Sequence, residues 1–354
     1  MMGLSRAKEV LVEMDLDAIL ISKPENRLYV SNFTGSTGNV LILKDKTYFL
    51  TDFRYIEQAQ KQCIGIEIVE VTKDKTLEDF ILSKKITKLG IEDMFVTYQQ
   101  FTDLSSKLEG IQLIELGQAI NKLRMIKTEE EIDSIRTAAA IADKGFEFIL
   151  PLIKPGKTEL ELALELEFFM RKNGAAKNSF DFIVASGVRS SLPHGKASNK
   201  VIEEGDFITF DFGCIYNSYC SDMTRTVVIG KANDKQKEIY NIVLESQQTS
   251  LQSVKPGLMG KEVDKIARDI ITNKGYGEYF GHNLGHGLGL EVHEMPTLGP
   301  LGDIVLEPGM IVTVEPGIYL PNFGGVRIED LVVVTENGYE VLSKSTKELI
   351  ELNI

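Results

Sequence analysis

The first third of the chain alternates short apolar runs with polar stretches of helical period. The apolar runs predict strands at residues 17–21, 40–43, 48–50, 66–71, 88–91 and 111–114. A polar turn, Lys44-Asp45-Lys46, separates the second run from the third and predicts a β-hairpin there. Strands separated by helical stretches are typical of a small α/β domain. The glycine-rich residues 35–38 lack the lysine and the following helix of a phosphate loop, so we interpret them as an ordinary loop.

Two helix starts follow this domain, and each has the same capping pattern. Thr128 stands three residues before Glu131, and Thr158 stands three residues before Glu161, so both pairs predict a capping box at the start of an amphipathic helix. The domain boundary therefore falls within residues 117–127. We divide the chain into an α/β domain at residues 1–122 and a second domain at residues 123–354.

The second domain contains an internal duplication. A Lys-Pro-Gly turn at residues 154–156 recurs 101 residues later, and the helix after each copy is expected to end at a glycine, Gly174 or Gly275. An apolar strand at residues 203–213 aligns with residues 307–317 at an offset of 104. The repeat predicts a pseudo-symmetric α+β domain whose halves span residues 128–230 and 234–337. We expect its paired sheets to face each other across a central cleft.

Composition narrows the range of functions. Of the 354 residues, 43% are hydrophobic and 26% charged, which indicates a folded globular protein. A net charge of -13 disfavours nucleic acid and anionic membrane surfaces as partners. No run reaches the ~18 apolar residues of a membrane span, and charged residues stand near the N-terminus where a signal peptide would be apolar. The three cysteines lack metal-ligand spacing, so we expect reduced thiols and a cytoplasmic location.

The four histidines are clustered. None occurs in the first 193 residues, whereas His282, His286 and His293 fall within twelve positions; the fourth is His194. A single histidine is more often structural than functional. Clustering makes a functional site the better interpretation here, provided that other polar residues surround it.

Four acidic residues are the polar residues expected around the histidine cluster. The repeat puts Asp211 and Glu315 at the same point of two apolar strands, where an ionised carboxylate is costly to bury unless it is paired, hydrogen-bonded or bound to a metal. Each strand is predicted to turn back as a hairpin. A turn at residues 216–217 would put Asp222 opposite Asp211, and a turn at Asn322 would put Glu329 opposite Glu315.

Opposed carboxylates repel each other, and the hairpins offer no Lys or Arg between them, so divalent cations are the expected neutralising charges. Together with the imidazole of His286, the four acids form an oxygen-rich set for two ions, which favours Mn²⁺ over structural Zn²⁺. Such a pair would activate a bridging water and stabilise an oxyanion. The alternative interpretation makes these acids solvated strand ends or partners of Arg225 and Arg327.

With these blocks in place, the chain resembles the pita-bread metallopeptidases, in the branch of Xaa-Pro aminopeptidase and prolidase that carries a creatinase-like N-terminal domain. The resemblance covers essentially the whole chain. It rests on blocks at residues 192–195 (LPHG), 211–213 (DFG), 221–226 (SDMTRT), 285–289 (GHGLG), 292–294 (VHE), 314–317 (VEPG) and 325–329 (GVRIE).

The resemblance implies specific roles. Cleavage between an N-terminal residue and proline would use two divalent ions, Mn²⁺ or else Co²⁺ or Zn²⁺. The implied ligands are Asp211, Asp222, His286, Glu315 and Glu329, with Asp222 and Glu329 bridging. His194 and His293 would contact substrate, with His293 touching the peptide carbonyl or moving a proton. Glu315 would be the general base. His282 would support the pocket, Arg327 would orient a ligating carboxylate, and Tyr319 is either a substrate-site or a core tyrosine.

Some positions depart from the family pattern. Asn283 stands where relatives commonly have a small residue. Thr297 stands where dipeptide-specific prolidases often have an arginine, four residues after His293. The choice between Xaa-Pro dipeptides and longer peptides with proline second therefore stays open. A non-catalytic peptide-binding relative and a methionine aminopeptidase are the alternative functions, and a metal-free creatine hydrolase would leave the five ligands unexplained. The resemblance also implies a homodimer.

Overall fold

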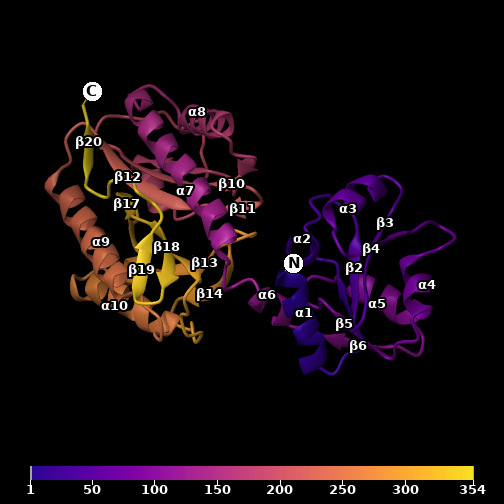
Figure 1. The fold of residues 1–354 in the computed structure, drawn as a ribbon. Helices are drawn as coiled ribbons and strands as arrows, with labels where there is room; N and C mark the ends of the chain where they lie inside the picture. The colour runs from indigo at the N-terminus through magenta and orange to yellow at the C-terminus, as the bar shows by residue number, and fades with distance from the viewer. Residues whose placement is uncertain (1, 354) are drawn as a thin grey trace. The chain divides into compact units, whose positions relative to one another are not determined.

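A computed structural model describes residues 2–353 of the chain (Figure 1). The chain divides into two compact units, of which the first ends at Arg124 and the second begins at Met125. Sequence patterning placed this division two residues earlier. Among the described residues, no helix is long and apolar enough to cross a membrane.

The first unit is an α/β domain around one six-stranded sheet, in the order β4-β3-β2-β1-β5-β6. All six predicted strands are confirmed, with ends that shift by at most one residue. The neighbours β1 and β2, and β2 and β3, are antiparallel, and the other pairs are parallel. The strands are β1 (Ala18–Ile21), β2 (Asn39–Leu43), β3 (Thr47–Thr51), β4 (Glu67–Glu70), β5 (Lys88–Ile91) and β6 (Gln112–Glu115).

Both faces of this sheet are buried, because successive side chains of a strand point to opposite sides. In β1, Ile19 and Ile21 belong to one hydrophobic cluster, and Ala18 and Leu20 belong to another. Residues 35–38 form neither helix nor strand, which confirms the predicted loop. The helices of this unit are α1 (Met2–Glu13), α2 (Pro24–Ser31), α3 (Ile56–Gln62), α4 (Leu77–Leu82), α5 (Tyr98–Lys107) and α6 (Ala119–Lys122).

The second unit begins with two capped helices. The strands of its first half follow them in the chain and precede the next pair of helices. Both predicted capping boxes are present: Thr128 accepts from the backbone N–H of Glu131, and Thr158 accepts from that of Glu161. The elements of the first half are α7 (Glu129–Ile149), η1 (Leu150–Leu152), α8 (Glu159–Lys172), β7 (Lys177–Asn178), β8 (Ile183–Ser186), η2 (Gly187–Ser191), β9 (Phe207–Phe212), β10 (Cys214–Tyr216), β11 (Tyr219–Cys220) and β12 (Met223–Ile229).

The second half repeats this order and adds the C-terminal strand. Its elements are α9 (Asp234–Ser253), α10 (Gly260–Asn273), η3 (Gly277–Tyr279), β13 (Gly285–Gly287), β14 (Glu294–Leu298), β15 (Ile311–Val314), β16 (Gly317–Leu320), β17 (Gly324–Arg327), β18 (Asp330–Thr335), β19 (Gly338–Val341) and β20 (Ile350–Leu352). The strands form one sheet ordered β20-β12-β9-β8 and another ordered β14-β13-β15-β18-β19, together with the β16–β17 hairpin and a small β11-β10-β7 sheet.

The duplication is confirmed by geometry. Helices α8 and α10 start 101 residues apart and end 101 residues apart, and β9 and β15 start 104 residues apart. The two turn glycines have matching φ angles, 91° at Gly156 and 90° at Gly257, which side chains other than glycine rarely adopt. Their N–H groups make equivalent bonds, from Gly156 to the carbonyl of Ile202 (3.0 Å) and from Gly257 to that of Leu306 (2.9 Å).

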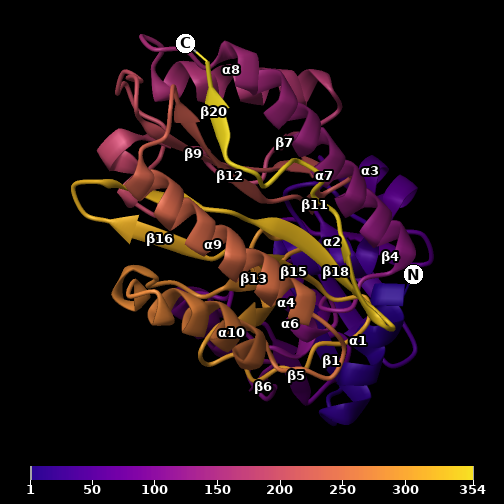
Figure 2. The ribbon, with the colours of Figure 1, turned by 90° about the vertical axis from the view of Figure 1, so that its left-hand side faces the viewer.

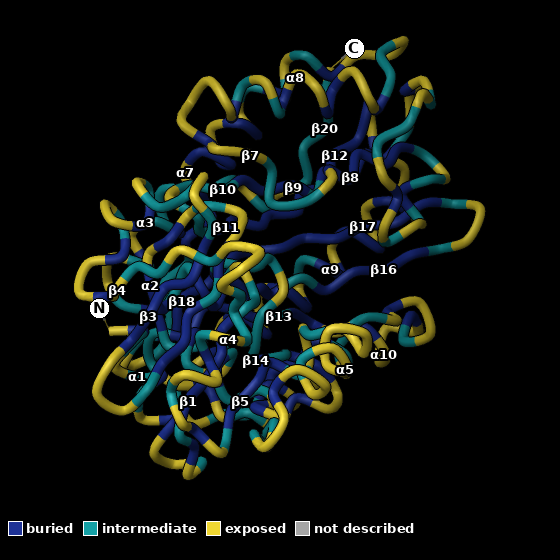
Figure 3. The backbone as a smooth tube through the Cα atoms, turned by 90° about the vertical axis from the view of Figure 1, so that its right-hand side faces the viewer, coloured by how far each residue is buried: buried dark blue, intermediate teal, exposed yellow. Residues whose placement is uncertain are grey.

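Each half covers its strands mainly with its own helices, although α7 also packs on β15 and β18 of the second half. Helices α7 and α8 pack on the first sheet, and α9 and α10 pack on the second, so strands occupy the middle of the unit (Figure 2). The central strands are largely buried, whereas the helices expose their outer faces (Figure 3). Functional side chains that project from the inner strand ends therefore lie in a low-dielectric environment. The predicted central cleft remains a prediction.

Candidate metal centre

The five predicted ligands lie within or directly beside strands of both halves. Asp211 is in β9, Asp222 directly precedes β12, and His286 is the middle residue of β13. Glu315 directly follows β15, and Glu329 stands between β17 and β18. Strand ends are where the apolar alternation stops, so a polar side chain can occur there without interrupting a ladder.

The first predicted hairpin is shifted in register. Asp211 pairs with Thr224, two positions beyond Asp222, so the predicted direct opposition of the two acids is wrong. The turn centres on Asn217 and Ser218, whose φ angles of 47° and 72° are those of a tight hairpin turn with positive φ at both central residues. Because side chains alternate along a strand, a shift of two leaves Asp222 on the same face as Asp211.

The second predicted hairpin has the predicted centre. The pairs Val314↔Asp330 and Gly317↔Arg327 flank the two glutamates, and both pairs are symmetric about Asn322. Glu315 and Glu329 thus lie across from each other where the ladder is interrupted. That interruption frees both carboxylates from the regular face of the sheet.

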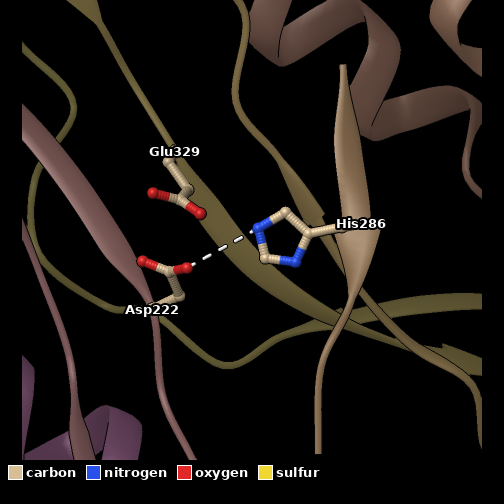
Figure 4. Close-up of side chains that lie close together, drawn as sticks. All are labelled: Asp222, His286 and Glu329. Atoms are coloured by element: carbon tan, nitrogen blue, oxygen red, sulfur yellow. Dashed lines mark ion pairs between the residues drawn. The ribbon is translucent and has the colours of Figure 1, made fainter. Parts of the chain in front are cut away.

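Asp222, His286 and Glu329 converge from three strands (Figure 4). One ligand atom from each lies within 4.8 Å of the other two. The Nε2 atom of His286 is 3.6 Å from Oδ2 of Asp222 and 3.2 Å from Oε1 of Glu315. The imidazole Nδ1 is 3.0 Å from the carbonyl of Gly287, so Nε2 is the nitrogen that faces the acids.

Asp211 is paired with Arg327, which the alternative interpretation of the sequence had offered as a partner of these acids. The expectation that no cation lies among the acids is wrong, because Nη2 of Arg327 donates to Oδ2 of Asp211 at 2.6 Å. The same guanidinium donates to the Tyr319 hydroxyl (2.7 Å) and, through Nε, to Oγ1 of Thr224 (3.1 Å). One arginine cannot neutralise four carboxylates, of which two are buried and two half-buried, so an excess of negative charge remains.

That excess is visible in the pKa directions. Burial, followed by the negative charges of neighbouring acids, raises the pKa of Asp222 and Glu329 well above the ordinary range. Glu315 behaves differently: burial opposes ionisation, but hydrogen bonding to and the charge of His286 outweigh it and lower its pKa to about 2. Burial also works against the charged form of His286, yet contact with Glu315 raises its pKa above the usual value.

The donor set fits a bound cation. Three buried carboxylate oxygens have no hydrogen-bond partner among the described residues: Oδ1 of Asp211, Oδ1 of Asp222 and Oε1 of Glu329. A buried acceptor without a partner is costly, and three in one cluster of acids indicate a site for positive charge. Oxygen atoms with one imidazole nitrogen suit Mn²⁺ and related ions.

Two threonines orient the ligands, and the sequence reading missed both. Oγ1 of Thr224 donates to Oε2 of Glu329 (2.7 Å), and Oγ1 of Thr313 donates to Oε1 of Glu315 (2.9 Å). Thr313 also accepts from the backbone N–H of His286 at 3.0 Å. Each threonine stands two residues from a predicted ligand, on the same face of its strand, which is the signal that could have identified it.

The other three histidines differ in burial. His293 and His194 are exposed, whereas His282 is half-buried. The His293 ring lies edge-on to the His286 ring with centroids 4.4 Å apart, and its pKa is lowered by burial of part of the ring and by the charges of His286 and His194. An exposed ring beside a predicted ligand does not fit the alternative of a satisfied core histidine.

Tyr319 is a buried residue with polar contacts on both sides of its hydroxyl. The hydroxyl lies 2.9 Å from Nε2 of His282 and accepts from Arg327. Burial raises the pKa of Tyr319 to about 12, so it stays protonated. His282 is held in turn by its Nδ1, 2.7 Å from the carbonyl of Asn283. These contacts link His282, Tyr319 and Arg327 to Asp211.

Comparison with known families agrees with this geometry. The profile of Metallopeptidase family M24 matches residues 133–336, which include all five predicted ligands. The chain belongs to metallopeptidase family M24. A second profile, the Creatinase/Prolidase N-terminal domain, matches residues 4–126. The expected fold class, an α/β domain followed by a pita-bread catalytic domain, is confirmed.

Several relatives of this M24 peptidase align over nearly their full length. An Xaa-Pro dipeptidase from Bacillus anthracis is 52% identical, with a TM-score of 0.96 and 99% of each chain covered. The Xaa-Pro dipeptidase of Pyrococcus horikoshii is 43% identical over 98% of both chains. An X-Pro aminopeptidase from Thermotoga maritima is 41% identical, with a TM-score of 0.89 and coverage of 98% of this chain and 100% of that one.

Proposed function

We propose that this M24 peptidase hydrolyses the bond between an N-terminal residue and a following proline. The observation that carries the proposal is the convergence of Asp222, His286 and Glu329 within 4.8 Å, together with buried carboxylate oxygens that have no hydrogen-bond partner within residues 2–353. Relatives named Xaa-Pro dipeptidase, at 43% and 52% identity over nearly the full length, support the choice of substrate.

Two divalent ions are proposed as cofactors, with Mn²⁺ preferred and Co²⁺ or Zn²⁺ as alternatives. Asp222 and Glu329 are the proposed bridging ligands, as the family resemblance implies, and each has one carboxylate oxygen with no partner among the described residues. Asp211, His286 and Glu315 complete the set. When bound, such ions lower the pKa of water and polarise the scissile carbonyl.

The surrounding side chains have distinct proposed roles. Glu315, held ionised by its contact with His286, is a proposed ligand and the proposed general base. His293, exposed beside His286, is assigned contact with the peptide carbonyl or proton transfer, as the family resemblance implies. His194 is assigned to substrate contact, and Arg327 holds Asp211 in place while Tyr319 and His282 brace Arg327.

The length of the substrate is not limited to dipeptides in this proposal. Thr297 lies in β14 and pairs with His286 across the ladder, so its short side chain is beside the proposed centre. Without an arginine there, a free carboxylate on the proline has no fixed cation at this position. Xaa-Pro dipeptides and short peptides with proline second are both proposed substrates.

Removing the metal tests the function directly. Protein stripped by a chelator is expected to lose hydrolysis of Xaa-Pro and to regain it with Mn²⁺ or Co²⁺, at close to two ions per chain, because the carboxylates need a cation to hold a nucleophilic water. Metal analysis and rate measurement on one preparation check this. Assaying Xaa-Pro against Xaa-Pro-Yaa-Zaa separates the dipeptidase from the aminopeptidase. Full activity in metal-free protein would refute the proposal.

A homodimer in the cytoplasm is the proposed state of the enzyme. The cytoplasmic setting is supported by Cys63, Cys214 and Cys220, all buried and free. The dimer rests on family resemblance, and we expect light scattering to give about twice the chain mass of 39.5 kDa. A monomer mass with activity unchanged on dilution would contradict it.

A further inference from the structure

Arg225 is a buried cation that stands three residues after the proposed ligand Asp222. Its side chain is 1% exposed, and it lies in β12. A guanidinium carries five N–H donors. All of them have acceptors: the carbonyls of Thr224 (2.9 Å), Glu329, Ser345 (2.7 Å) and Thr346 (2.9 Å), and Oδ1 of Asp330 (2.8 Å).

These acceptors come from both halves of the catalytic unit. Thr224 belongs to the first half, and Glu329 and Asp330 belong to the second. Thr224 and Glu329 are also joined directly, since the N–H of Glu329 donates to the Thr224 carbonyl at 3.1 Å and the Thr224 hydroxyl donates to the Glu329 carboxylate at 2.7 Å. Arg225 therefore fixes two carbonyls beside a proposed metal ligand.

The remaining acceptors lie in residues 343–348, which we call the C-terminal clasp. Asp143 in α7 anchors the clasp by accepting from the N–H groups of Lys344 (2.8 Å) and Ser345 (2.7 Å). Lys347 pairs with Asp330. After the clasp, β20 pairs in parallel with β12, so the end of the chain returns from the second half to the first.

We propose that Arg225 is a positioning residue that couples the C-terminal clasp to the proposed ligand Glu329. The guanidinium contacts the backbone of Glu329 rather than its carboxylate, so it acts through the ligand. Without it, the Glu329 carbonyl and Oδ1 of Asp330 would be buried without the donor that Arg225 supplies, although Lys347 and Gln247 still contact Oδ2 of Asp330, and local rearrangement to satisfy them would displace Glu329. Groups that orient a ligand typically change metal affinity by about 10- to 100-fold. The inference rests on the proposed function in taking Glu329 as a ligand.

The test measures Mn²⁺ affinity by calorimetric titration of chelator-stripped full-length protein. Arg225→Met should weaken Mn²⁺ binding by about 10- to 100-fold. Arg225→Lys keeps the charge but has three donors and no planar fork, so its affinity should lie between those of the parent and Arg225→Met. Asp143→Ala, which loosens the clasp far from Glu329 in the chain, should weaken binding by about 2- to 30-fold.

Arg27 provides the matched control. It is 3% exposed and donates to the carbonyls of Gly35 and Gly38 at 2.8 Å, but it lies in the first unit. Arg27→Met should lower the melting temperature and leave Mn²⁺ affinity within about twofold of the parent, because a purely structural loss does not reach the metal.

Three outcomes decide the matter. Mn²⁺ affinity of folded Arg225→Met within twofold of the parent overturns the proposal. If that variant does not fold, Arg225→Lys and Asp143→Ala decide it in the same way, and parent-like affinity in both overturns it. A parent protein that binds no Mn²⁺, Co²⁺ or Zn²⁺ would instead refute the proposed function, so the two failures are distinguishable.

Discussion

Replacing His286 by alanine is expected to remove bound metal and activity together. His286 supplies the nitrogen of the cluster, with Nε2 3.2 Å from Glu315 and 3.6 Å from Asp222. Loss of an outer partner typically costs 10- to 100-fold in metal affinity, so loss of a ligand atom should cost about 100-fold or more. At a metal concentration that just saturates the parent, kcat/KM should fall in parallel. Metal content after dialysis, measured with kcat/KM, checks this.

The assignment of His286 as a metal ligand predicts two further properties of His286→Ala. Excess Mn²⁺ should restore part of the activity, because four carboxylates remain to hold the ions. Melting temperature in the absence of metal should fall, because Glu315 loses the partner that holds it ionised and the cluster of acids loses a positive charge. Retention of the parental metal content would show that His286 is not a ligand.

Replacing His293 by alanine is expected to lower kcat by ~10²-fold or more while metal stays bound. A positioned acid-base or oxyanion-stabilising group usually contributes about this factor. His293 is suited to the role because it is exposed and its ring centroid is 4.4 Å from that of His286. Metal content, melting temperature and kcat are to be measured on one preparation.

His286→Ala and His293→Ala are controls for each other, since the two rings are neighbours. If His293→Ala loses its metal, the role assigned to His293 is wrong. If its turnover is near normal, His293 takes no part in the reaction. A lower melting temperature with parental turnover would be the signature of a structural histidine.

Local patterning predicted most elements because their determinants are short in sequence. The strands of the first unit follow from apolar runs, and α7 and α8 start at the predicted caps Thr128 and Thr158. The duplication was detectable because turn glycines such as Gly156 and Gly257 recur at a constant offset. The hairpin about Asn322 was predicted correctly, and its ladder from Gly317↔Arg327 to Leu320↔Gly324 is symmetric about that residue.

The first hairpin shows where such arithmetic fails. Its register was predicted two positions wrong, because the turn uses Asn217 and Ser218 with positive φ rather than residues 216–217. Symmetry between Asp211 and Asp222 did not reveal that β9 and β10 are separate strands interrupted at Gly213. A shift by an even number preserves the face, which is why the acids still converge.

By itself, the sequence determined where most helices and strands lie and which residues are candidates for the metal site, because residue types, caps and repeat offsets are properties of neighbouring positions. The tertiary structure decided which side chains meet across the halves. The Arg327–Asp211 pair joins positions 116 residues apart, and the Arg225–Asp330 pair joins positions 105 apart. Contacts of that kind depend on how two sheets pack, and packing is set by the sum of many buried side chains rather than by any local pattern.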